Sequence, residues 1–208
     1  EAIAGFDSAD NVRPSDMGHL AAYGDRAEHS LEIQLPFLQY SLGTFRLVPI
    51  VMGDQKRESA VMLARAIAGA VRGKNVLIVG SSDLSHFFPS DQARQFDNRV
   101  KTYIESYDFD GLLADDAVER SHVCGRGPIA ATMMACRDIG ATRSTVLRMA
   151  NSGDVTGDAR SVVGYLAAAF SRRDESGGLG DGDAGEPKVG VDLGLSDKEK
   201  EILRDVVR

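Results

Sequence analysis

Tryptophan is absent from this chain of 208 residues, and cysteine occurs only twice. Two cysteines cannot form the disulfide framework of a small secreted domain, so we expect a reducing compartment, the cytoplasm. Long apolar runs are also missing, and the longest, such as residues 76–79 and 166–170, are far too short to span a bilayer. Basic residues are outnumbered, 24 against 31 acidic ones, and form no stripe. We therefore expect neither a nucleic-acid nor a membrane partner.

What remains is the composition of an ordinary globular protein, 43% hydrophobic and 26% charged. Helical spacing of apolar residues predicts helices at residues 30–42, 59–71, 90–105, 110–118 and 128–139. Apolar runs bounded by turn signals predict strands at residues 45–52, 75–80, 145–150 and 161–170, and the run at 75–80 is typical of a strand buried on both faces. This alternation predicts an α/β fold of layered αβα type, with a central, mostly parallel or mixed sheet flanked by helices.

The composition changes after Arg173, which divides the chain into three parts. Residues 1–173 form the predicted first domain. Residues 174–195, rich in glycine and aspartate at their start, are predicted to be a flexible linker. Ser196 and Glu199 fit a capping box, so residues 196–208 are expected to be the first helix of a truncated second domain. Because the first residue is Glu1 rather than methionine, we expect the first domain to begin inside a longer protein.

Four short polar clusters follow or precede these elements: EHSLE at residues 28–32, SSDLSH at 81–86, CGRGP at 124–128 and NSGD at 151–154. Polar and titratable residues at the ends of elements are the usual material of an α/β site. Histidine, cysteine and aspartate are ligands of transition metals, and they also form nucleophile–base pairs. The clusters are therefore the candidate functional site.

Asp83 and His86 follow the predicted strand at 75–80, and a tight turn would let both point into one cleft for proton transfer. In the alternative, Ser81, Ser82 and Asp83 only cap the turn. A histidine beside the turn favours the functional interpretation.

His29 lies between two acids at a helix start, where the positive end of the helix dipole disfavours an imidazolium. The neutral ring would be able to bind a metal, although an ion pair explains the position equally well. Cys124 precedes a helix N-terminus, which favours the thiolate as nucleophile or metal ligand. An ordinary buried cysteine is the alternative.

The remaining candidates are weaker. His122 is close to Cys124 in sequence, but a loop histidine is more often solvated, and His19 is expected to be structural or exposed. The cluster at 151–154, with Asp158 and Arg160 behind it, either orients substrate or simply forms a turn. Cys136 lies on an apolar helix face, so we assign it no role.

The clusters in this order resemble the Memo-like family, also described as AmmeMemoRadiSam system protein B. The residues that carry the resemblance are EHSLEIQLPFLQ at 28–39, VPIVMG at 48–53, SSDLSH at 81–86, CGRGPIAATM at 124–133, and NSGDVTGD with VVGYLAAAF within 151–170. The family is similar in fold to class III extradiol dioxygenases, which use non-haem iron. The tail at 196–208 resembles the start of the protein A domain of the same system.

The resemblance implies a redox metal, Fe(II) or copper, with His29 and Cys124 as ligands. His86 would be the acid/base residue, with Asp83 beside it. The family's further histidine ligand comes from an early Pro-His-Ala-Gly segment, which this sequence lacks. Only two of three ligands can be named, and we expect that the chain as given binds metal weakly or not at all.

Three functions follow from this interpretation. The first is a metal-dependent oxidoreductase or dioxygenase-like enzyme that works with a radical SAM protein and the protein A domain of its system. The second is a non-enzymatic module that binds a peptide or another partner in the same cleft. The third is a metal-free hydrolase with Cys124 as nucleophile and His86 as base, which needs an oxyanion hole from the nearby glycines.

Overall fold

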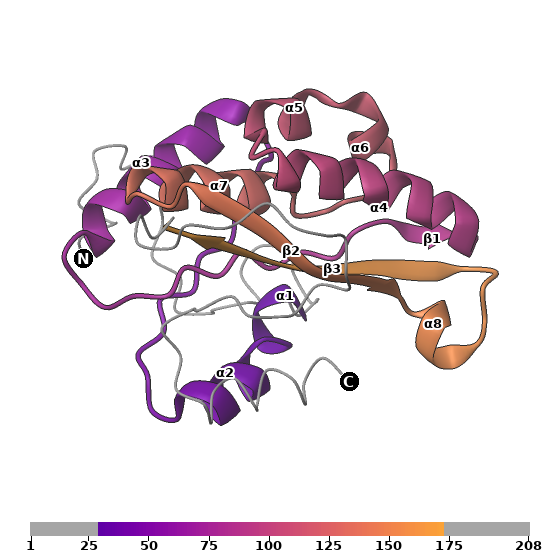
Figure 1. Cartoon of the computed structure of the whole chain (residues 1–208), viewed down its shortest axis with the longest axis horizontal. Helices are drawn as coiled ribbons and strands as arrows, with labels where there is room; N and C mark the ends of the chain where they lie inside the picture. Colours follow the sequence, from indigo (N-terminus) through magenta and orange to yellow (C-terminus); the bar gives the residue numbers. More distant parts are fainter. Residues whose placement is uncertain (1–28, 173–208) are drawn as a thin grey trace, which may run out of the picture.

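A computed structural model describes residues 29–172 of the chain (Figure 1). The predicted linker at 174–195 and the helix at 196–208 lie outside the described residues, as does His19. The helices are α1 (His29–Glu32), α2 (Leu35–Leu42), α3 (Arg57–Val71), α4 (Ser90–Glu105), α5 (Phe109–Ala114), α6 (Asp116–Arg120), α7 (Arg126–Asp138) and α8 (Gly153–Thr156). The strands are β1 (His86–Phe88), β2 (Arg143–Asn151) and β3 (Val162–Ser171).

The described strands form one sheet in the order β1-β3-β2, with both pairings antiparallel. Helices α3 to α7 lie on one side of this sheet, and we call them the helix layer; α1 and α2 lie on the other side (Figure 1). The layered α/β architecture is therefore confirmed. The strand direction differs from the mostly parallel or mixed sheet that the alternation suggested, because β2 and β3 are joined by the short α8 segment and not by a long crossover helix.

The hydrophobic core lies between the helix layer and the sheet. Its largest fully buried apolar side chains are Val100 on α4, Leu112 on α5, Val118 on α6 and Met133 on α7. From the sheet, β2 and β3 add partly buried side chains, namely Val146, Leu166, Ala168 and Phe170. Apolar burial on this scale is the main source of folding free energy, so this side of the sheet holds the fold together.

Three long helices were predicted closely because their sequence signals are local. Helices α3 and α4 match the expected ranges to within two residues, and α7 begins two residues earlier than expected. The range 110–118 is two helices, since Asp115 ends α5 and caps α6 by accepting the Ala117 N–H at 2.7 Å. The range 30–42 is also broken, and Pro36 lies in the first turn of α2, where its missing N–H costs nothing.

Two predicted strands were wrong. Residues 45–52 and 75–80 form no strand, and Leu77 is 64% exposed where a strand buried on both faces was expected. A strand needs a hydrogen-bonded partner strand, and within residues 29–172 neither run has one.

None of the helices within residues 29–172 is both long enough and apolar enough to cross a lipid bilayer.

Candidate functional site

Two side-chain hydrogen bonds join the cluster at 81–86 to the cluster at 124–128 and to Gln34, two residues after the cluster at 28–32. The Ser82 Oγ accepts the backbone N–H of Gly125 at 2.9 Å, which joins the turn before β1 to the segment before α7. The Gln34 side-chain amide donates to the Ser81 Oγ at 3.0 Å, which joins the same turn to the α1–α2 segment. These contacts span 43 and 47 residues of sequence, so the tertiary fold brings the cluster at 81–86 to the cluster at 124–128 and to the segment between α1 and α2.

His86 has a defined tautomer in this arrangement. Its Nδ1 lies 2.7 Å from the carbonyl oxygen of Leu84, and a carbonyl can only accept, so the Nδ1 carries the proton. The Nε2 is then the basic nitrogen, and it lies 3.5 Å from an Asp83 carboxylate oxygen. Asp83 is half exposed while the His86 ring is largely covered. This pair can take up and release a proton at the Nε2 beside solvent.

Phe87 lies at the exposed edge of the His86–Asp83 pair. It is 75% exposed and has a φ of +67°, a left-handed conformation that is unfavourable for a bulky residue. The pairing of β1 with β3 shifts register at this residue, between His86 and Phe88. The Phe87 ring tilts against the His86 ring with 5.7 Å between centroids. Strained backbone of this kind clusters at functional sites, so Phe87 is a candidate ligand contact.

Tyr165 belongs to the same face of the sheet, although sequence reasoning missed it. His86 pairs with Val163, and side chains two residues apart along a strand share a face, so His86 and Tyr165 face the same way. Burial and the negative charge of Asp83 both raise the pKa of Tyr165, which keeps its phenol protonated as a hydrogen-bond donor. We call the face that carries His86, Val163 and Tyr165 the site face. Strict alternation along the predicted strand would have revealed this tyrosine.

Cys124 is an exposed free thiol, two residues before the start of α7. The glycine N–H groups beside it are already in use: Gly125 donates to Ser82, and Gly127 donates to the Gln55 side-chain oxygen at 2.6 Å. A Cβ at either glycine would overlap Ser82 or Gln55, so both positions serve close packing. These two N–H groups therefore do not form the oxyanion hole that a Cys124–His86 hydrolase requires.

His29 is the first residue of α1. Among residues 29–172 no three histidine, cysteine or acidic side chains are grouped as a metal site. A thiol and an imidazole are suitable donors for a soft or borderline ion, but the described residues do not assemble a complete ligand set.

The other candidates have structural explanations. In the cluster at 151–154, the Asn151 side chain donates to Ser90 and accepts from Gly153, and Asp154 accepts the Asn151 N–H, so the cluster forms a turn. Asp158 and Arg160 form an exposed ion pair with each other. His122 is exposed and its ring lies against Phe88, with 5.8 Å between centroids. Cys136 is buried, and burial raises its pKa to about 11.

The fold and these contacts define an α/β protein that carries the titratable residues Asp83, His86 and Tyr165 as a candidate site opposite its helix layer. The chain belongs to the Memo-like protein family, whose pattern it matches over residues 11–169. It is 41% identical over 156 residues to a MEMO1 family protein of Methanothermobacter thermautotrophicus, covering 74% of this chain and 56% of that protein. It is 43% identical over 147 residues to a MEMO1 family protein of Methanosarcina acetivorans, covering 69% and 55%.

A third relative, a MEMO1 family protein of Sulfolobus acidocaldarius, is 41% identical over 148 residues, which cover 69% of this chain and 51% of that protein. The chain thus spans about half the length of the relatives it matches.

Proposed function

We propose that this protein binds a redox metal, iron or copper, through His29 and Cys124, and that His86 and Asp83 handle a proton beside it. The observation that supports this most is the Ser82–Gly125 hydrogen bond, since it joins the His86 turn to the Cys124 segment. The Gln34–Ser81 contact joins the segment that carries His29 to the same turn. A bound ion of this kind would supply redox or oxygenase-like chemistry with an open coordination position.

The chain's own residues have defined tasks in this proposal. The Leu84 carbonyl keeps the His86 proton on Nδ1, so the Nε2 is free to accept a proton from a bound molecule. The Asp83 carboxylate, 3.5 Å from that nitrogen, stabilises the imidazolium that results. The Tyr165 phenol, on the same face, donates a hydrogen bond to the bound molecule, and Phe87 covers its edge.

We further propose that the protein acts in an AmmeMemoRadiSam system, with a radical SAM protein and a protein A domain as partners and a small molecule or peptide as ligand. Membership of the Memo-like family supports this context. Both cysteines are free thiols, which suits a cytoplasmic location.

Metal analysis of the purified protein tests the proposal. After loading with Fe(II) or Cu(II), we expect the wild type to bind the metal weakly, since only two of the three expected ligands are present, and we expect this binding to be lost in both His29→Ala and Cys124→Ala. His122→Ala and Cys136→Ala are matched controls, because they remove the same atom types outside the site, and they should retain the metal. A wild type without metal after loading with Fe(II) and with Cu(II) would sink the proposal.

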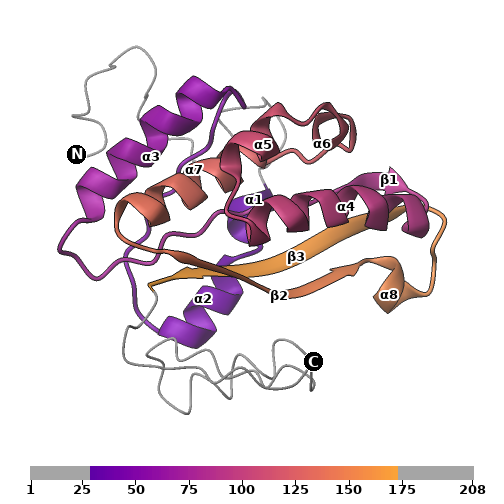
Figure 2. The ribbon, with the colours of Figure 1, turned by 45° about the horizontal axis from the view of Figure 1, so that its top comes forward.

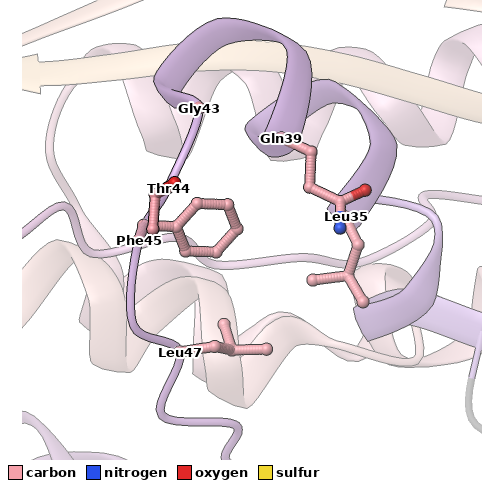
Figure 3. Close-up of a pocket in the computed structure, with 6 residues that line it drawn as sticks. All are labelled: Leu35, Gln39, Gly43, Thr44, Phe45 and Leu47. Atoms are coloured by element: carbon pink, nitrogen blue, oxygen red, sulfur yellow. The ribbon is translucent and has the colours of Figure 1, made fainter.

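A second candidate function is the non-enzymatic module for a peptide partner, placed in a separate hollow rather than in the cleft expected from the sequence, and one observation favours it. A hollow of about 380 Å³ opens beside α2, and its lining includes apolar side chains of Leu35, Phe45 and Leu47 but neither Asp83 nor His86 (Figure 3). On α2 itself, Phe37 and Tyr40 are more than half exposed. Tight peptide binding that survives Cys124→Ala and His29→Ala but is lost in Phe45→Ala would favour this function over the first.

A further inference from the structure

Asp97 is a buried carboxylate that the functions above leave unused. It lies in the middle of α4, which runs alongside β3 (Figure 2), and only 2% of its surface is exposed. A buried ionisable group is unfavourable unless it is paired or hydrogen-bonded. Arg94 acts on Asp97 electrostatically but forms its own ion pair with Asp154. The presence of this carboxylate in the core therefore requires an explanation.

Its hydrogen bonds lead to the turn that carries His86. The Ser85 backbone N–H donates to the Asp97 Oδ1 at 2.9 Å, and the Ser85 residue is itself fully buried. The Ser85 hydroxyl lies 3.4 Å from the carbonyl of Ala93, one turn earlier on α4. Helix α4 thus holds the residue immediately before His86 through a side chain and a backbone carbonyl.

Gly164 on β3 holds Leu84 and Ser85 from the side opposite α4. Its N–H donates to the Ser85 carbonyl and its carbonyl accepts the Leu84 N–H, both at 2.9 Å. A Cβ at this glycine would collide with the Asp97 carboxylate, so the strand can approach only without a side chain. The carboxylate and the glycine together fix Leu84 and Ser85 between α4 and β3.

Leu84 is the residue whose carbonyl accepts the Nδ1–H of His86. We infer that Asp97 is a positioning residue of the site: by holding Ser85 against α4 it fixes the Leu84 carbonyl, and through that carbonyl it sets the ring orientation and tautomer of His86. This inference rests on the proposed proton role of His86 and is independent of the metal.

The charges at this position are consistent with that role. Burial raises the pKa of Asp97, while the Ser85 hydrogen bonds and the nearby His86 act in the opposite direction. A carboxylate that served packing alone would be replaceable by an apolar residue of similar volume. The Asp97 carboxylate oxygen, however, accepts the hydrogen bond of the buried Ser85 N–H. Removal of that oxygen leaves the Ser85 N–H buried without an acceptor.

The inference is tested by determining the tautomer of His86 from the ¹⁵N chemical shifts of its ring nitrogens. Spectra are recorded at about pH 8.5, well above the ordinary histidine pKa of about 6.5, and assigned with His86→Gln. We expect a single tautomer protonated on Nδ1 in the wild type. Asp97→Asn keeps an oxygen acceptor for Ser85 and should retain it. Asp97→Ala removes the acceptor, and Gly164→Ala displaces it, so both should lose the single Nδ1–H tautomer.

Asp115→Ala is the matched control. Asp115 is also a nearly buried aspartate that accepts a backbone N–H, from Ala117, but it serves α6 rather than the His86 turn. This variant should be destabilised and keep the wild-type His86 tautomer.

The inference is contradicted if a folded Asp97→Ala or Gly164→Ala protein retains the Nδ1–H tautomer, or if the wild type does not have it. Failure of both loss variants to fold, with Asp115→Ala folded, would also contradict it, because Asp97 would then act mainly in stability. None of these readings depends on metal binding, so the metal proposal can fail without deciding this one.

Discussion

The two sides of the sheet differ in what their side chains do. On the side of the helix layer, Val100, Leu112 and Met133 are fully buried. On the other side Tyr165 is 44% exposed, and outside the sheet, in the runs at 45–52 and 75–80, large apolar residues such as Val48 and Leu77 are well exposed. The first side contains the apolar burial that stabilises the fold, and the second presents the titratable residues. Substitutions on the two sides should therefore separate stability from site chemistry.

The largest expected effect is on stability in the helix layer. Met133→Ala removes a fully buried side chain and should lower the free energy of unfolding by about 2–5 kcal/mol. Leu77→Ala, at a position 64% exposed, should change it by less than about 0.5 kcal/mol. Urea unfolding of both variants measures the contrast. Equal losses in the two variants would show that the contrast between the buried helix layer and the exposed run at 75–80 is wrong.

A smaller effect concerns the pH dependence at Asp97, which lies on α4 and faces β3. The pKa of Asp97 is raised above 3.8 by burial, so the folded protein holds this proton more tightly than the unfolded chain does. Wild-type stability therefore falls as pH rises from about 3.8 through the higher folded pKa, and Asp97→Asn has no such loss. The variant's free energy of unfolding relative to wild type should rise over that window and then level off. A flat or falling difference in urea unfolding across the window would contradict this.

A still smaller effect is expected at Tyr165, where it tests whether the tyrosine shares the site with Asp83. The charge of Asp83 contributes to the raised pKa of Tyr165, so Asp83→Asn should lower the phenol pKa. The pKa is read from ultraviolet absorbance of the wild type against Tyr165→Phe. Asp110→Asn is the control, since Asp110 pairs with Arg57 in the helix layer. A phenol pKa that responds equally to both aspartate changes would place Tyr165 outside the site.

Sequence reasoning succeeded where the signal was local. The range of α4 could be predicted from the spacing of Val100 and Ile104 and their neighbours. Asp83 and His86 stood out because they follow an apolar run, and their roles stay predictions. The runs at 45–52 and 75–80 misled, because an apolar pattern does not reveal whether a partner strand is present. Asp97 was missed because one acid in a polar-looking helix gives no sign that it faces the core. Its role depends on Gly164, which is 67 residues away along the chain.

The central claim is that His29 and Cys124 hold one metal ion, and the labelling rate of Cys124 tests it most directly. Cys124 is exposed, while Cys136 is buried with its pKa raised to about 11, so a thiol reagent should modify Cys124 far faster. Under anaerobic conditions, Fe(II) at ten times its dissociation constant should slow this labelling roughly tenfold in the wild type. The account predicts that His29→Ala abolishes the protection. Equal protection with and without His29, or no protection in the wild type, would contradict it.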